Sequence, residues 1–356
     1  MKKAAAAAMM AMSAAGCQRD LIFGGVDLVS AVPNPPNLET PVKTDVITQV
    51  TTPKVDILWV IDDSGSMSEE QQQLIESFPA FMQYFLDSGL DWHIGVVSTD
   101  MADNSKSGKL QGAGGVRYLD PDTPNPIELY NQMARLGING SSDEMGRRAA
   151  MKALTDPLLN GFNQGFYRDE ASLSVIVISD EPDYSGTEPT ANEFINFLNA
   201  LKPDAEDVEF SSIVAPEQGC ALASYPGTDY IRVTNAVGGL FQNICSADWV
   251  PMLDALGLQA AGLKREYFLS ELPIEDTIQV WVEDDGFIYD GIDRARIEAG
   301  EDPSDLCESG TCFEYTYEPV RNSILMYDYI PNPLAKINIH YELLSEYEPQ
   351  AGDESL

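Results

Sequence analysis

Residues 55–67 read Val-Asp-Ile-Leu-Trp-Val-Ile-Asp-Asp-Ser-Gly-Ser-Met, and this stretch decides the fold. Its first part, 55–61, is almost continuously apolar, which is typical of a parallel strand buried on both faces of a sheet. Further apolar runs follow at 94–97, 173–178 and 208–214. We therefore expect four central strands in this part of the chain.

Helical patterns separate these runs. From Leu74 to Phe85 apolar residues recur at steps of three and four, as expected for one face of a helix that contains Pro79. Further helix candidates lie at 143–154, 191–201 and 248–258. Strands that alternate with helices predict an α/β fold with a doubly wound, mostly parallel sheet over residues 54–261.

The flanking segments have a different composition. Residues 17–53 are rich in proline and are predicted to be a tether, in which 45–51 can add an edge strand. Short strand candidates separated by turn signals predict a small antiparallel β module over 262–345. Residues 346–356 are predicted to be a frayed acidic tail.

The charge of the chain excludes several kinds of partner. Its 356 residues include 57 acidic and 21 basic ones, which give a formal net charge of −36 at pH 7. A nucleic-acid-binding protein needs basic surface to displace counterions, so we expect no nucleic acid as a partner. The same charge suits divalent cations. No apolar run reaches the roughly 18 residues that a membrane span requires.

The N-terminus is typical of a processing signal. Residues 1–17 begin with Lys2 and Lys3, continue with a short apolar stretch and end in Ala-Ala-Gly-Cys. The pattern resembles a bacterial lipoprotein signal, which implies removal of residues 1–16 and lipidation, including palmitate, at Cys17. Gln18 is the type of residue that favours the outer membrane in such proteins. We therefore expect an outer-membrane lipoprotein of a Gram-negative cell envelope, and the alternative is a secreted or periplasmic protein.

The cysteine count agrees with export. If Cys17 carries lipid, four cysteines remain, which is an even number. Cys307 and Cys312 enclose a short loop in which Gly310 permits a turn, and this favours a local disulfide bond. The other predicted pair is Cys220 with Cys245.

Polar oxygen ligands follow the predicted strands. Asp62, Ser64 and Ser66 come directly after the first strand, and Asp180 follows the third. Carboxyl ends of neighbouring parallel strands meet at one edge of a sheet, where ligands bind. Carboxylate and hydroxyl oxygens are hard ligands, so we predict a site for Mg²⁺ or Ca²⁺, with Mn²⁺ as a further candidate.

These motifs carry a family resemblance. The sequence Asp-x-Ser-x-Ser at 62–66 resembles the metal-ion-dependent adhesion site of von Willebrand factor type A domains. Ile-Ser-Asp at 178–180 is similar to the second acidic motif of that family, and the glycine pair at 238–239 is similar to the one before its last strand. The resemblance covers residues 54–260. It implies the family's α/β fold and a metal that binds a partner's carboxylate.

One loop departs from the family pattern. The family supplies a Thr from a separate loop, and here that loop reads Asn-Gly-Ser-Ser-Asp-Glu-Met-Gly at 139–146. Either Ser142 replaces the Thr hydroxyl or Glu144 supplies a carboxylate. Glu144 is slightly favoured, because its charge has no other evident partner nearby. A carboxylate would strengthen binding of the ion and weaken attraction of an acidic partner.

Three functions from different classes remain. The resemblance implies a non-enzymatic, divalent-cation-dependent adhesion or protein-interaction module at the cell envelope, whose unknown protein partner supplies Asp or Glu. The alternative is a structural component of an envelope assembly with a closed metal site. A metal-dependent hydrolase is less favoured, because the chain lacks the G-x-x-x-x-G-K-[ST], H-E-x-x-H and G-x-S-x-G motifs.

Overall fold

The computed structural model describes residues 40–49, 54–86, 88–204, 207–221, 223, 225–307, 310–327 and 329–344. The chain divides into two compact units, Met1–Pro41 and Val42–Leu356, and the account below concerns the second. The predicted signal peptide, the lipidation site Cys17 and the acidic tail at 346–356 lie outside the described residues.

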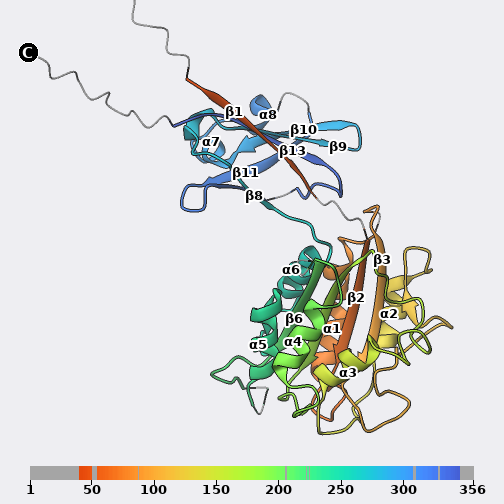
Figure 1. The fold of residues 1–356 in the computed structure, drawn as a ribbon. Helices are drawn as coiled ribbons and strands as arrows, with labels where there is room; N and C mark the ends of the chain where they lie inside the picture. Colours follow the sequence, from red (N-terminus) through yellow and green to blue (C-terminus); the bar gives the residue numbers. More distant parts are fainter. Residues whose placement is uncertain are drawn as a thin grey trace, which may run out of the picture. The chain divides into compact units, whose positions relative to one another are not determined.

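One sheet of the second unit has six strands in the order β4-β3-β2-β5-β6-β7 (Figure 1). Its strands are β2 (Lys54–Ile61), β3 (Asp91–Ser98), β4 (Tyr118–Leu119), β5 (Ser172–Ser179), β6 (Val208–Val214) and β7 (Phe241–Asn243). The pairs β2–β3, β2–β5, β5–β6 and β6–β7 are parallel, and β4 is antiparallel to β3.

Alternate residues of β2 enter two separate apolar clusters, because successive side chains of a strand point to opposite faces. Ile57 and Trp59 belong to one cluster, whereas Leu58 and Val60 belong to the other. The first cluster contains residues of the helices α1 (Ser68–Met82), α2 (Pro126–Ala134) and α6 (Val250–Ala260). The second contains residues of α3 (Gly146–Ala153), α4 (Ala191–Asn199) and α5 (Thr228–Val237). Both faces of β2 are therefore covered.

The register of this sheet places the candidate site. Ile61 at the end of β2 pairs with Ser98 of β3 on one side and with Ile178 of β5 on the other. The loops that follow these strands therefore leave the sheet at the same edge. Asp62 comes directly after β2, and Asp180 directly after β5.

The other sheet has seven strands in the order β1-β13-β9-β10-β11-β12-β8 (Figure 1). Its strands are β1 (Val42–Thr48), β8 (Glu266–Phe268), β9 (Gln279–Asp284), β10 (Phe287–Asp293), β11 (Cys312–Glu318), β12 (Ser323–Met326) and β13 (Lys336–Glu342). The 3-10 helix η3 (Glu275–Thr277) precedes β9, and the short helices α7 (Arg294–Glu298) and α8 (Pro303–Leu306) connect β10 to β11. That connection joins the parallel pair of this sheet, and its other strand pairs are antiparallel.

The predicted fold class, an α/β fold with a doubly wound, mostly parallel sheet and a small antiparallel module, is wrong for this chain. The structure has two mixed sheets, and the larger one is the seven-stranded sheet, which is mainly antiparallel. It is not a small appendage of residues 262–345, because β1 comes from the predicted tether and pairs along its length with β13. Apolar runs report buried central strands only. Half-exposed strands such as β1 are held by backbone pairing, which leaves no such run.

The cysteines lie in the predicted pairs. Cys220 and Cys245 are at disulfide distance with their Cα atoms 6.2 Å apart, and Cys307 and Cys312 are at disulfide distance with their Cα atoms 5.8 Å apart. Within the described ranges, the model contains no helix that is long and apolar enough to cross a membrane.

Candidate functional site

Asp62 is fully buried at the carboxyl end of β2. Its Oδ1 accepts a hydrogen bond from the backbone N–H of Ser64 at 2.8 Å, and its Oδ2 accepts one from the hydroxyl of Ser179 at 2.6 Å. Burial raises the pKa of Asp62 to about 6, against the lowering effect of these hydrogen bonds. Within the part of the chain that the structure describes, the carboxylate therefore has neutral donors and no ion pair with a basic residue.

The two serines of the Asp-x-Ser-x-Ser motif connect Asp62 to the next strand. The hydroxyls of Ser64 and Ser66 lie 3.1 Å apart, and the Ser66 hydroxyl donates to Oδ1 of Asp180 at 3.1 Å. Burial also raises the pKa of Asp180, which is 3% exposed. The structure thus brings together all four of the residues predicted from the two strand ends.

The two candidate ligands in the loop at 139–146 differ in burial. Ser142 is exposed, whereas Glu144 is fully buried. Oε2 of Glu144 accepts a hydrogen bond from the Thr99 hydroxyl, and Oε1 of Glu144 has no partner among the described residues. Burial and the nearby charge of Asp62 together raise the pKa of Glu144 to about 9. Glu144 therefore lies close enough to Asp62 for their charges to interact, and one of its oxygens has no partner among the described residues.

Backbone contacts hold this loop against the strand ends. Gly140 donates its N–H to the carbonyl of Asp63 at 2.8 Å, and Met145 donates to the carbonyl of Thr99 at 3.2 Å. The side-chain amide of Gln71 donates to the carbonyls of Asp62 and Gly137 at 3.0 and 2.9 Å. The helix α1 begins after Met67 without a side-chain cap, so the capping-box pattern at 68–71 does not form one. Gln71 binds the site loops instead.

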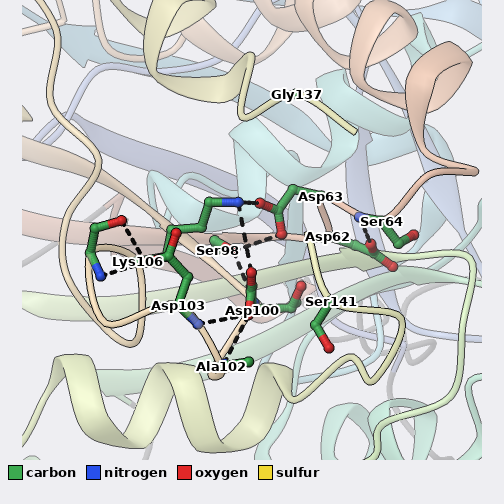
Figure 2. Close-up of polar contacts among 12 residues, drawn as sticks. Asp62, Asp63, Ser64, Ser98, Asp100, Ala102, Asp103, Lys106, Gly137 and Ser141 are labelled. Atoms are coloured by element: carbon green, nitrogen blue, oxygen red, sulfur yellow. Dashed lines mark hydrogen bonds and ion pairs between the residues drawn. The ribbon is translucent and has the colours of Figure 1, made fainter. Parts of the chain in front are cut away.

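A second group of acids beside the site, Asp63 and Asp100, has a lysine as its basic partner. Figure 2 shows the ammonium group of Lys106 between the carboxylates of Asp63 and Asp100. Lys106 forms an ion pair with Asp63 and lies 3.8 Å from Asp100. The Ser98 hydroxyl donates to the other oxygen of Asp63 at 2.8 Å. Asp100 also accepts the backbone N–H groups of Ala102 and Asp103.

The buried acids of the described part of 54–260 therefore fall into two groups. Those of the first group have a basic partner: Asp56 pairs with Arg168, and Asp63 and Asp100 share Lys106. Those of the second group have no ion pair with a basic residue in the described structure: Asp62, Glu70, Glu144 and Asp180. The second group lines the predicted metal site.

This donor set fits a hard divalent cation. A buried carboxylate without a partner is costly, and the free oxygen of Glu144 is such a group. Within the described residues, no group of three or more His, Cys, Asp or Glu side chains is arranged to hold a metal. The three carboxylates of the predicted set, on Asp62, Glu144 and Asp180, are therefore not arranged to hold an ion together in this structure, and the set also relies on the hydroxyls of Ser64 and Ser66.

Two acids that follow β5 have different environments. Asp183 is not available as an ion ligand, because Arg147 donates to it from its backbone N–H and from Nε, both at 3.0 Å. Glu181 is half-buried, and burial and Asp180 raise its pKa.

Sequence reasoning missed Glu70 and Lys106. Glu70 lies in the first turn of α1, four residues after Ser66, and that spacing was the available signal. Lys106 comes from the loop after β3, and no pattern in the sequence links it to Asp63.

Comparison with known proteins gives weak likeness only. No family profile and no curated protein sequence matches the chain. Among solved structures, it is similar to proximal thread matrix protein 1 of the mussel byssus, at 12% identity and a TM-score of 0.39 over 61% of this chain. It is also similar to the pilus adhesin SpaC of Lactobacillus rhamnosus GG, at 12% identity and a TM-score of 0.39 over 85% of this chain. The chain spans 48% and 41% of these two proteins, respectively.

Proposed function

We propose that residues 54–260 bind a divalent cation at the carboxyl ends of β2 and β5 and form a non-enzymatic, cation-dependent binding module. The observation that carries this proposal is the group of four buried acids without a basic partner in the described structure, whereas Asp56, Asp63 and Asp100 have one. A divalent cation at Asp62 and Asp180 would remove the repulsion among them.

The proposed ligands are the carboxylates of Asp62, Asp180 and Glu144 and the hydroxyls of Ser64 and Ser66. Mg²⁺, Ca²⁺ and Mn²⁺ all accept such oxygen ligands. In this proposal Glu144 takes the place that we had left open between it and Ser142. Its burial and its unpartnered oxygen favour it, whereas Ser142 is exposed and serves the rim.

The rim of the site supports a partner that carries a carboxylate. Ser66 and Ser142 are exposed, so solvent reaches the site from their side. A hollow of about 250 Å³ next to the Glu144 loop is lined by Arg148 and Lys152 of α3. The partner that this rim favours is a protein segment with an exposed Asp or Glu.

A closed structural site is the second candidate. Three carboxylates around one divalent ion leave a net negative charge, which disfavours a further carboxylate from outside. The two functions differ in one measurable respect, since only the binding module responds to an acidic ligand. In both, the lipid anchor at Cys17 and the cell-envelope location are part of the proposal.

The first experiment tests the cation. We would strip the protein with chelator and follow thermal unfolding and calorimetry with Mg²⁺, Ca²⁺ and Mn²⁺. Mass action predicts about 2.7 kcal/mol of stabilisation at a free-ion concentration one hundred times the dissociation constant. Asp62→Ala should abolish this effect. Asp169→Ala is the matched control, because Asp169 is exposed and precedes β5 at the other end of the sheet. An unchanged melting temperature with all three ions would refute the site.

The second experiment separates binding from structure. We would titrate the protein with the peptide acetyl-Gly-Asp-Gly-amide and with its Asn analogue, and follow amide shifts by NMR. A binding module should respond to the Asp peptide at Ser66 and Ser142, and only when Mg²⁺ is present. Stabilisation by Mg²⁺ without any response to the peptide would favour the closed site.

A further inference from the structure

Glu70 is a buried acid without a role in the fold as described. It lies in the first turn of α1 and is 5% exposed, although its neighbour Glu69 is exposed. Its Oε2 is buried and has no hydrogen-bond partner among the described residues. A helix position next to solvent normally turns such a side chain outward, because burying an unpaired charge is costly. The inward position of Glu70 therefore needs an explanation.

The surroundings of Glu70 point to the cation site. The charge of Asp180 is close enough to act on Glu70, and together with burial it raises the pKa of Glu70. The next residue, Gln71, donates its amide to the carbonyl of Asp62. The first turn of α1 thus lies against the same loops as Asp62 and Asp180. The first turn of α1 favours a carboxylate, and the backbone N–H of Glu70 lowers its pKa against the effect of burial, but no described basic residue pairs with it and its Oε2 has no partner among the described residues.

We propose that Glu70 is a positioning residue of the cation site, whose free oxygen accepts a hydrogen bond from water bound to the ion. This inference rests on the proposed function. Glu70 then completes a set of four carboxylates around the site, with Asp62, Glu144 and Asp180. Outer carboxylates of this kind hold ligands and water in place, and their loss weakens metal affinity.

The test compares two neighbouring acids. Glu70→Gln and Glu69→Gln change the net charge equally and lie on the same turn, but only Glu70 of the two is buried. With Mg²⁺ and Ca²⁺ as probes, we expect Glu70→Gln to weaken affinity roughly ten- to a hundredfold. Glu69→Gln should change it by less than about threefold, since an exposed charge is screened. The melting temperature of the ion-free protein should not fall in Glu70→Gln, because the variant removes a buried charge without a partner.

Several results would overturn the inference, and they differ from a failure of the proposed function. If the wild type shows no response to any cation, the proposed site itself fails. If the wild type responds and both variants bind equally well, Glu70 has no part in the site. A loss of ion-free stability in Glu70→Gln with unchanged affinity would assign Glu70 a structural role instead. Glu70→Asp, which keeps the charge with a shorter reach, replaces Glu70→Gln if the latter does not fold, and we expect its affinity to fall as well.

Discussion

A buried aspartate lies at each end of β2, and the two aspartates have different kinds of partner. Asp56 near the start of the strand and Asp62 just after its end are both fully buried. Asp56 accepts the backbone N–H of Arg168 at 2.6 Å and its Nε at 2.8 Å, and His93 lies 3.6 Å away. In the described structure, the Asp62 carboxylate accepts a backbone N–H and a serine hydroxyl and has no ion pair with a basic residue. The buried acid near the start of β2 therefore has a basic partner, whereas the one after its end has none in the described structure.

This difference indicates where the protein can bind a cation from outside. In a buried ion pair the protein itself supplies the opposite charge, so that position does not bind a charged ligand from outside. A buried acid that is held in place by neutral donors keeps its geometry and lacks only positive charge. Burial raises the pKa of Asp56 as well, but Arg168 acts against that rise, and no basic side chain does so for Asp62. The following predictions test this comparison, beginning with the largest expected effect.

Arg168→Met should cause the largest loss of stability. The substitution leaves Asp56 buried without a cation, and breaking a buried pair in this way costs about 3–5 kcal/mol. Urea unfolding at neutral pH measures the change. Arg232→Met is the control, because Arg232 is exposed and donates only to Asn192. The double variant Asp56→Asn with Arg168→Met should recover part of the loss, and no recovery would contradict the role of the unpaired charge.

Lys106→Met should have a smaller effect of the same sign. Asp63 is fully buried, but the Lys106 side chain is 18% exposed, so water compensates part of the loss. We expect about 1–3 kcal/mol of destabilisation. The measurement is again urea unfolding, without divalent ions. If adding Mg²⁺ restores this variant more than it stabilises the wild type, the Asp63–Asp100 pair also accepts an ion. The division between acids with and without a cation would then be less sharp.

Unlike Arg168→Met and Lys106→Met, Glu144→Gln should not lower the free energy of unfolding. It removes an acid that has no cation, and the amide oxygen of Gln can still accept the Thr99 hydroxyl. In ion-free protein we expect the free energy of unfolding to stay constant or to rise by up to about 1 kcal/mol. Asp56→Asn should lower it, because Arg168 loses its buried partner and keeps the half-exposed Asp91. Differential scanning calorimetry of both variants in chelator checks this, and a large loss in Glu144→Gln would place Glu144 in the fold rather than in the site.

The sequence was informative where burial is complete. The apolar run of β2 and its counterparts in β3, β5 and β6 were predicted, since strands buried on both faces are made mostly of apolar residues. The overall fold class was wrong because the larger sheet is the seven-stranded, mainly antiparallel one, in which the edge strand expected at 45–51 is β1 (Val42–Thr48). Pairing between Val42 and Glu342 is a long-range backbone contact, and no local pattern reports it.

The residues of the candidate site could also be predicted only in part from the sequence. The residues at 62–66 and Asp180 could be found because strand ends in parallel register meet at one edge. The choice between Ser142 and Glu144 needed the burial of each side chain, which depends on how the loop packs. Lys106 and Glu70 were missed for a related reason, because a charge pattern in the sequence does not show which charges have partners. The two compact pairs of cysteines were accessible from count and spacing.

Lys54→Gln should have the smallest effect and closes the comparison. Lys54 is the first residue of β2, and its Nζ lies 3.0 Å from Oε1 of Glu170, with side-chain exposures of 38% and 60%. It is thus an ion pair at the same end of the strand as Asp56 and Arg168, but it lies in solvent. Water and salt replace an exposed pair at little cost, so we expect the urea midpoint to remain within experimental error at both low and high salt. Loss of stability equal to that of Arg168→Met would mean that ion pairing at this end matters regardless of burial. The contrast between Asp56 and Asp62 would then rest on position in the sheet, and burial without a cation would no longer mark the site.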